Sequence, residues 1–341
     1  GADALRLTLI TGNAPGNDMR FYWERVEASR NFANKVWNAS RFIMMNLEGM
    51  EVTKPAISDL APEDKWILSA VNTLTKEVTE NMDKFELGIA VQKVYDFIWD
   101  EFCDWYIELV KYRIYHSDEN YKSANAALWT LKTVLGNALK MLHPFMPFVT
   151  EEIYSALVPE EKSLMMSDWP QFSEDWCYAD AENITDHMKE VIRGVRNARA
   201  EMNVPPSRKA KVYVVCEDEK LCEGFEELTT CACPLMSASE LAVQADKAGI
   251  ADDAVSIVVP DASVYVPLEE LIDFEQEIER LTKEEEKLTK EINRAKGMLS
   301  NEKFVSKAPQ AKVDEEKAKL EKYTQMMEQV KERLEALKAG R

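Results

Sequence analysis

The strongest constraint on the fold lies in the last part of the chain, residues 267–341, where apolar side chains recur in alternating steps of three and four. This spacing draws one apolar stripe along a helix and predicts helices that pack along their stripes as a coiled coil. The segment between the two periodic runs, around Asn301 and Pro309, is too short to connect parallel helices of this length. The runs are therefore predicted to fold back as an antiparallel coiled-coil hairpin. The repeat positions are Leu271, Phe274, Ile278, Leu281, Glu285, Leu288, Ile292, Ala295 and Leu299, then Val313, Glu316, Leu320, Tyr323, Met327, Val330, Leu334 and Leu337.

The predicted hairpin is long and almost neutral. Two arms of about 28 residues, rising 1.5 Å per residue, would reach roughly 40 Å. Residues 267–341 contain 16 Lys and Arg and 18 Asp and Glu. Any contact with a polyanion would therefore use a few placed cations rather than a broad electrostatic field. The candidates follow one flank of the first arm in steps of three and four: Lys283, Lys287, Lys290 and Arg294.

Residues 1–170 are predicted to be helical, with a Gly-rich extended segment at residues 11–18. Apolar stripes predict helices at about 23–47, 87–112 and 123–142, a further helix that begins near Pro62, and a short one after Pro147. Proline suits the first turn of a helix because its missing N–H would have no partner there. The short connections predict antiparallel neighbours in an up-and-down bundle.

The first long helix of this bundle separates into two faces over residues 30–47. Its apolar sector is Phe32, Val36, Trp37, Ile43, Met44 and Leu47, and its polar sector is Asn31, Asn34, Lys35, Asn38 and Arg41. Phe42 falls among the polar residues. An aromatic ring beside amides and a cation can stack an unpaired base while its neighbours contact base edges and phosphate. The alternative is that Phe42 packs against a neighbouring helix.

Residues 176–266 predict a small α+β module of one helix over three short strands. The helix covers residues 184–201, one strand covers 211–216, and a hairpin turns at Pro260-Asp261. From Lys189 to Lys211 there are seven Lys and Arg against two Glu. The cations predicted to lie openly on the helix are Lys189, Arg193, Arg196 and Arg199. They predict either an RNA-binding surface or an ordinary solvated helix face.

Composition excludes several classes of protein. A net charge of −19 argues against a general nucleic-acid binder, since nonspecific affinity comes from phosphate neutralisation. Apolar runs fall short of the roughly 20 residues that span a bilayer. The six cysteines lack a paired framework, so reduced thiols are expected, and Cys231-x-Cys233 lacks the spacing of a zinc site. The sequence shows no nucleophile elbow, phosphate loop or metal-binding helix, and His143 before Pro144 is interpreted as structural.

Several segments carry a family resemblance. The segment Arg30–Phe42 resembles the first helix of the anticodon-binding domain of the class Ia aminoacyl-tRNA synthetases, and its sequence is most similar to that of the valyl-tRNA synthetases. Residues 1–6 resemble the segment after that family's catalytic KMSKS loop, and residues 96–108 and 142–152 resemble two further helices of the domain. A C-terminal coiled-coil hairpin is typical of bacterial valyl-tRNA synthetases and separates them from their leucyl and isoleucyl relatives.

The resemblance implies a C-terminal portion of a longer enzyme, with an anticodon-binding bundle at 1–170, a linker module at 176–266 and a tRNA-binding arm at 267–341. The parent enzyme would use ATP to charge tRNA(Val) with valine. Its catalytic and editing domains would precede Gly1, so no catalytic residue, cofactor or metal is expected here. The implied setting is a cytoplasmic monomer with tRNA(Val) and its own catalytic domain as partners and no membrane. The implied tRNA-binding residues are Lys35 and Phe42, with Asn31 and Asn38 added from the helix face, Arg193, Arg196 and Arg199 from the basic helix, and Lys283, Lys287, Lys290 and Arg294 from the hairpin.

A rival from another class remains. The bundle and coiled coil could form a structural protein-interaction module without RNA binding. An exposed apolar seam on the hairpin would favour that rival, whereas an open Asn/Lys/Phe face on the first long helix would favour RNA.

Overall fold

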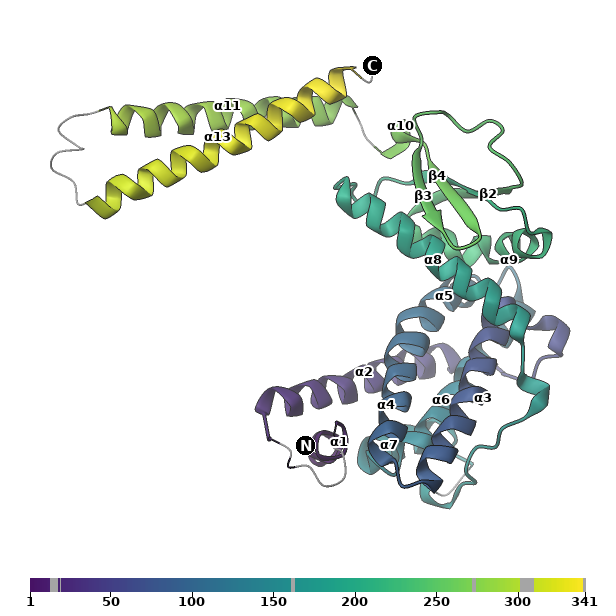
Figure 1. Ribbon diagram of the computed structural model, residues 1–341. Coiled ribbons are helices and arrows are strands. Elements are labelled where there is room, and N and C mark those ends of the chain that lie inside the picture. Colours follow the sequence, from purple (N-terminus) through teal and green to yellow (C-terminus); the bar gives the residue numbers. More distant parts are fainter. Residues whose placement is uncertain (13–17, 19, 161–162, 272–273, 301–309, 340–341) are drawn as a thin grey trace. The chain divides into compact units, whose positions relative to one another are not determined.

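A computed structural model describes residues 1–12, 18, 20–160, 163–271, 274–300 and 310–339. The chain divides into two compact units, Gly1–Val266 and Pro267–Arg341 (Figure 1). The expected bundle and the expected small module both lie in the first unit, and the hairpin forms the second. The predicted fold class, mainly α with a helix bundle, a small α+β module and an antiparallel coiled-coil hairpin, is confirmed.

The bundle forms where the apolar stripes predict helices. Its α-helices are α1 (Ala2–Ile10), α2 (Trp23–Leu47), α3 (Pro62–Asp83), α4 (Leu87–Asp96), α5 (Ile107–Tyr115), α6 (Tyr121–Leu142) and α7 (Pro147–Leu157), with 3₁₀ turns η1 (Ile57–Asp59), η3 (Leu164–Met166) and η4 (Glu174–Trp176). Pro62 and Pro147 each occupy the first turn of their helix, as expected. The core is filled by large side chains such as Phe32, Phe102 and Tyr106, which are fully buried.

The third predicted helix is continuous but not uniform. Between α4 and α5 the chain is wound as a π-helix, η2 (Phe97–Tyr106). A π-helix bonds each residue to the fifth along rather than the fourth, and it occurs frequently at functional sites. The expectation of a regular α-helix over residues 87–112 is therefore wrong in its middle. The buried side chains of η2 are Phe97, Ile98, Phe102, Trp105 and Tyr106. Their spacing of one, three and four residues is also that of a buried α-helical face, so it does not reveal the π-helical winding.

A buried ionic cluster fixes α5 to the start of α3. The Arg113 guanidinium donates to Glu63 at 2.6 Å and to Asp64 at 2.7 and 2.8 Å, and the Tyr106 hydroxyl donates to Asp64 at 2.8 Å. Burial disfavours the charge on Arg113, but Asp64 and Glu63 hold its pKa well above the ordinary value. Burial raises the pKa of Glu63 despite the nearby guanidinium. Because two oxygens of Ser123 accept the remaining bonds, the buried cation is well satisfied.

The small module contains one more strand than predicted. Its elements are α8 (Ala179–Glu201), β1 (Ala210–Val215), α9 (Glu219–Met236), β2 (Ala238–Gln244), β3 (Val255–Val259) and β4 (Ala262–Val266), with strand order β2-β1-β4-β3. The expectation of three strands missed β2, an edge strand parallel to β1 whose burial does not alternate. Parallel neighbours require a crossover, and α9 supplies it. Gly194 lets α8 lie close to the sheet, since a Cβ there would sit 2.8 Å from Ile257.

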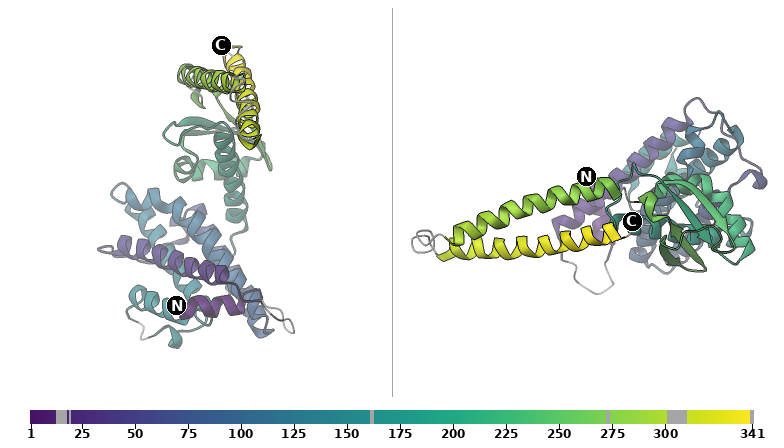
Figure 2. Two further views of the ribbon diagram at one scale, coloured as in Figure 1. Left: turned by 90° about the vertical axis from the view of Figure 1, so that its left-hand side faces the viewer. Right: turned by 90° about the horizontal axis from the view of Figure 1, so that it is seen from above.

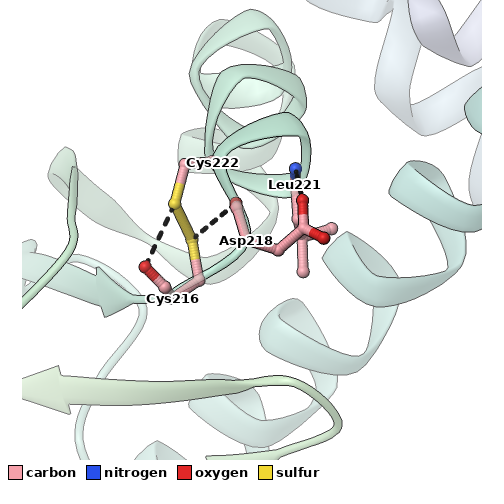
Figure 3. Close-up of a disulfide and its surroundings, with 4 residues drawn as sticks. All are labelled: Cys216, Asp218, Leu221 and Cys222. Atoms are coloured by element: carbon pink, nitrogen blue, oxygen red, sulfur yellow. Dashed lines mark hydrogen bonds between the residues drawn. A yellow bond between two sulfur atoms is a disulfide. The ribbon is translucent and has the colours of Figure 1, made fainter.

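The turn from β1 into α9 carries a disulfide between Cys216 and Cys222 (Figure 3). Cys216 follows the last residue of β1 and Cys222 lies in the first turns of α9, so the tight connection brings their Cα atoms to 6.3 Å. Asp218 caps the helix between them by accepting a hydrogen bond from the Leu221 N–H at 2.9 Å. The expectation that all thiols are reduced is wrong for this pair. Cys103, Cys177, Cys231 and Cys233 are free thiols.

The second unit is the predicted antiparallel coiled coil. After the short helix α10 (Leu268–Leu271), α11 (Phe274–Leu299) and α13 (Gln310–Ala339) lie side by side (Figure 2). The seam buries Leu281, Leu288, Val330 and Leu334, with Ile278, Tyr323, Met326 and Met327 packed beside them. The predicted loop at residues 301–309, the side chains of Phe274 and Leu337, and most of the extended segment at residues 11–18 lie outside the described residues.

Candidate nucleic-acid interface

The polar face of α2 stays at the surface of the bundle. Asn31 and Asn38 are exposed, whereas Lys35 and Phe42 are partly buried against the helix that runs from α4 to α5. Phe32, Val36 and Ile43 on the opposite face are fully buried. One predicted core residue is misplaced, because Trp37 is 39% exposed. It lies at the margin of the apolar sector, where a wide indole ring reaches solvent.

Lys35 is held by two groups from η2. Its Nζ lies 2.5 Å from Asp104 Oδ1 and 3.9 Å from the centroid of the Trp99 ring. The Lys35 side chain is 23% exposed and the Asp104 side chain 53%. The Lys35 side chain is therefore held by two contacts and remains partly exposed.

Phe42 packs against α5 without being enclosed. Its ring meets the edge of Tyr115 at a centroid distance of 6.4 Å and an interplanar angle of 86°. Lys111 places its Nζ 5.8 Å from the centre of the same ring. Phe42 thus combines contact with a neighbouring helix and a partly exposed ring, beside an exposed Tyr115 and a second cation. An aromatic pair beside a lysine offers stacking surface and charge to an unpaired nucleotide.

Sequence reasoning missed the partners contributed by the second helix. The sequence did not single out Trp99, Asp104, Lys111 or Tyr115 as contacts of this face. The four-residue spacing of Lys111 and Tyr115, which places them on one helix face, was the available signal. That they face Phe42 depends on packing, which spacing within one helix does not reveal.

The basic helix α8 presents only part of its predicted charge. Arg199 is only 6% exposed and donates to the carbonyls of Pro205 and Arg208, so it closes the turn after the helix. Lys189 is only 5% exposed, bonds Glu101 at 2.8 Å and Asp186 at 2.9 Å, and lies over the Trp66 ring. The expectation that both lie openly is therefore wrong. Lys189 lies where α8 packs along α3, and the chain that follows α8 turns back over Arg199.

Arg193 and Arg196 remain on the exposed side of α8. Both guanidinium groups lie over the buried Trp105 ring, at 5.1 and 5.9 Å from its centroid. Arg193 also pairs with Glu190 at 2.5 Å, and Arg196 donates to the Leu235 carbonyl at 2.6 Å. Burial lowers the pKa of Arg196 and of Arg199, but an arginine remains charged at neutral pH.

The hairpin cations are fully at the surface. Lys283, Lys287, Lys290 and Arg294 are all exposed on α11. Arg294 approaches Glu291 on its own helix at 4.0 Å. Among the seam positions of α11, Glu285 is polar, and its Oε1 lies 3.9 Å from Lys331 Nζ.

No group of three or more His, Cys, Asp and Glu among the described residues is arranged to hold a metal ion. No helix among them combines the length and apolarity needed to cross a bilayer. His143 bonds Thr150 Oγ1 at 2.8 Å, and burial lowers the pKa of its imidazole.

Comparison with known proteins identifies two regions of the chain. Residues 64–214 match the family model described as the anticodon-binding domain of tRNA ligase, and residues 273–338 match the valyl tRNA synthetase tRNA binding arm. The first match contains Trp99, Asp104, Lys111 and Tyr115, and the second contains the hairpin cations.

Relatives align along almost the whole chain. A valine–tRNA ligase of Clostridium tetani is 52% identical over 99% of this chain, and one of Oceanobacillus iheyensis is 44% identical over 99%. The chain spans 38% of the length of these relatives. A solved LeuRS–tRNA–LeuAMS complex of Agrobacterium radiobacter gives a TM-score of 0.40 at 18% identity, covering 53% of this chain and 20% of its own.

Proposed function

This chain belongs to the valyl-tRNA synthetase family, of which it carries the anticodon-binding domain and the tRNA-binding arm, and we propose that it recognises tRNA(Val) for a longer valine–tRNA ligase. The bundle would hold the anticodon, the small module would bridge, and the hairpin would lean on the outer corner of the tRNA. The observation that carries the proposal is that both tRNA-contact regions of one family follow each other in one chain.

The geometry supports the anticodon assignment at α2. Lys35 and Phe42 lie on one face of the helix, seven residues apart, with exposed Asn31 and Asn38 beside them. The Phe42 ring would stack an anticodon base, and Lys35 would contact a base edge or phosphate. Arg193 and Arg196 of α8 and the four hairpin cations would contact the tRNA backbone. Arg199 keeps a structural role at the end of α8.

The chemistry of aminoacylation would take place outside this chain. ATP and valine would bind in the remaining part of the longer relatives, and the tRNA would be the partner of the portion described here. We place the protein in the cytoplasm as a monomer that requires no metal or cofactor in this region. A preparation of this chain alone should then give no valine-dependent exchange of labelled pyrophosphate into ATP.

The rival interpretation, a structural protein-interaction module, is less well supported. It would be favoured by an apolar seam left open on the hairpin. The described seam residues of α11 and α13 instead bury each other within one chain. The α2 face, with its amides, cation and aromatic ring at the surface, fits RNA better than a protein-binding apolar patch.

The direct test is binding to tRNA transcripts. The 341-residue chain is titrated with tRNA(Val) and with the same transcript carrying a changed anticodon, at two salt concentrations. We expect tighter binding to the natural anticodon and weaker binding to both at the higher salt. Absence of binding to either transcript by a folded preparation would reject the proposal. Equal binding to both would reject the anticodon assignment.

A further inference from the structure

The setting of Lys35 suggests a second set of residues in RNA recognition. A lysine side chain usually holds its charge in no fixed position, because its four-carbon chain is flexible and must be ordered on binding. Here the ammonium group lies between the Asp104 carboxylate, at 2.5 Å, and the face of the Trp99 ring, at 3.9 Å. Both contacts come from the π-helical segment η2. The side chain is therefore ordered before any RNA arrives.

The π-helical winding explains how both contacts reach one lysine. Trp99 and Asp104 are five residues apart. In an α-helix, at 100° per residue, they would be separated by about 140° around the axis and would face different neighbours. In a π-helix the hydrogen bond itself joins residues five apart, so the two side chains lie on the same side. The segment Phe97–Tyr106 is wound in this way.

The Trp99 side of this arrangement is anchored in the bundle core. The indole stacks on Tyr95 at 5.7 Å and 10°, and on the fully buried Phe32 at 6.4 Å and 18°. Phe32 and Tyr95 stack on each other at 4.3 Å. Because Phe32 lies on α2 one turn before Lys35, the same aromatic stack fixes the helix that carries the lysine and the ring on which the lysine rests.

We propose that Trp99 and Asp104 are positioning residues for tRNA recognition, brought together by the π-helix so that Lys35 is presented in a fixed geometry. The proposal rests on the proposed function, in which Lys35 contacts tRNA. Neither Trp99 nor Asp104 needs to touch the RNA. Their effect is to lower the ordering cost of the lysine and to fix the direction of its charge.

Removing the charge of Asp104 tests this role, because the direction of the change in tRNA affinity depends on what Asp104 does. Asp104 is half-exposed at a surface meant for a polyanion, so its charge alone opposes binding. If it acts only as a nearby negative charge, Asp104→Asn should tighten tRNA binding. If it positions Lys35, the same substitution should weaken binding although a repulsive charge has been removed. The two roles predict opposite changes.

The experiment measures the Kd of the full chain for a tRNA(Val) transcript in four variants: Lys35→Ala, Asp104→Asn, the double variant, and Asp100→Asn. Asp100 is the matched control, because it is an exposed carboxylate of the same π-helical segment that forms no ion pair with Lys35 in the described structure. We expect Asp104→Asn to raise the Kd about threefold to tenfold, the range of a modest coupling between contacting residues. Asp100→Asn should leave it unchanged or slightly lower.

The double variant separates this inference from the proposed function. In the Lys35→Ala background, Asp104→Asn should no longer weaken binding, since there is no lysine left to position. If Lys35→Ala weakens binding but Asp104→Asn tightens it as Asp100→Asn does, the positioning role is overturned and the proposed function stands. If Lys35→Ala binds tRNA as well as the parent chain, the role of Lys35 fails and the positioning role fails with it.

Trp99 is tested through its ring. Trp99→Phe keeps an aromatic face for the ammonium group and should retain most of the tRNA affinity. Trp99→Leu should raise the Kd by about the same factor as Asp104→Asn. Thermal unfolding is measured for both, because Trp99 also packs on Phe32. Equal tRNA binding by Trp99→Leu and the parent chain, at a temperature where both are folded, would overturn the assignment of this residue.

Discussion

The bundle and the hairpin each contain a charged side chain among apolar ones, and the two regions stabilise that charge differently. In the bundle, the Arg113 guanidinium is buried and donates five hydrogen bonds of 2.6–2.8 Å to Glu63, Asp64 and Ser123. In the hairpin, the seam residue Glu285 is 34% exposed and lies 3.9 Å from Lys331. The buried cation is stabilised by hydrogen bonds within the protein, whereas the partly exposed carboxylate is stabilised largely by water.

The same contrast applies to the cations proposed to meet tRNA. Lys35 of the bundle contacts Trp99 and Asp104, while Lys287 and Lys290 of the hairpin are exposed on a helix surface. Fixed groups can discriminate between bases because their geometry is set in advance. Exposed cations that contact phosphate supply affinity that depends on salt and not on sequence. Under the proposed function, we therefore expect anticodon discrimination to depend on the bundle and general retention of the tRNA to depend on the hairpin.

The largest effect is expected at Arg113. Arg113→Ala leaves Glu63 and Asp64 buried without their cation and should cost about 3–5 kcal/mol of unfolding free energy. Urea unfolding of the full chain, followed by tryptophan fluorescence, measures the loss. Lys331→Ala in the hairpin is the contrasting variant and should change stability by less than about 1 kcal/mol. Similar losses in the two variants would remove the distinction between the two regions.

The next effect concerns base stacking at Phe42. Phe42→Ala should weaken tRNA binding by about 1–3 kcal/mol, the scale of base–aromatic stacking. Filter binding with the tRNA(Val) transcript measures it, and thermal unfolding records the accompanying loss of packing against Tyr115. Phe85→Ala is a suitable control, since that ring is 85% exposed on the turn after α3. A Phe42→Ala chain that is less stable but binds tRNA normally would leave Phe42 as a packing residue only.

Removal of the hairpin should have a smaller effect of a different kind. A chain ending at Val266 retains the whole first compact unit and should stay folded. It should lose tenfold or less in tRNA affinity, roughly the share of a few phosphate contacts, and show a shallower dependence on salt. Its preference for the natural anticodon should persist. Loss of that preference would place discrimination in the hairpin and reverse the comparison.

Most helices were predictable because their apolar side chains repeat at the helical period, and α2 begins and ends at the predicted residues. The π-helix was not predicted, because the buried residues from Phe97 to Tyr106 have a spacing that an α-helix also shows. β2 was missed because an edge strand need not alternate between apolar and polar residues. The disulfide between Cys216 and Cys222 depends on how tightly the chain turns after β1, which cysteine spacing alone does not reveal.

The surface position of the candidate site was predictable on α2, but its contacts with other helices were not. The face of α2 follows from the helical period, so Lys35 and Phe42 could be named from the sequence. Their partners Trp99, Asp104 and Tyr115 lie at least 60 residues away in the sequence and are brought near by bundle packing. Lys189 and Arg199 were assigned to the surface because cations on an amphipathic helix usually lie there. Both are buried because each finds charged or carbonyl partners.

The smallest predicted effect tests whether the seam charge of the hairpin serves any purpose. Glu285→Leu makes the seam of α11 apolar from Leu281 to Leu288. It should stabilise the hairpin by about 0.5–1 kcal/mol, since a polar seam residue costs stability and a leucine there would be only partly buried. Hydrogen exchange measured on α11 and α13 would report this as slower exchange. Binding of tRNA should not change, because Glu285 faces the partner helix rather than the exposed flank of Lys287 and Lys290.

A polar seam residue can also specify register and pairing. If Glu285→Leu produced dimers or faster exchange, this carboxylate would be needed for the hairpin to pair correctly, and the seam charge of the hairpin would be as necessary as the buried cation of the bundle.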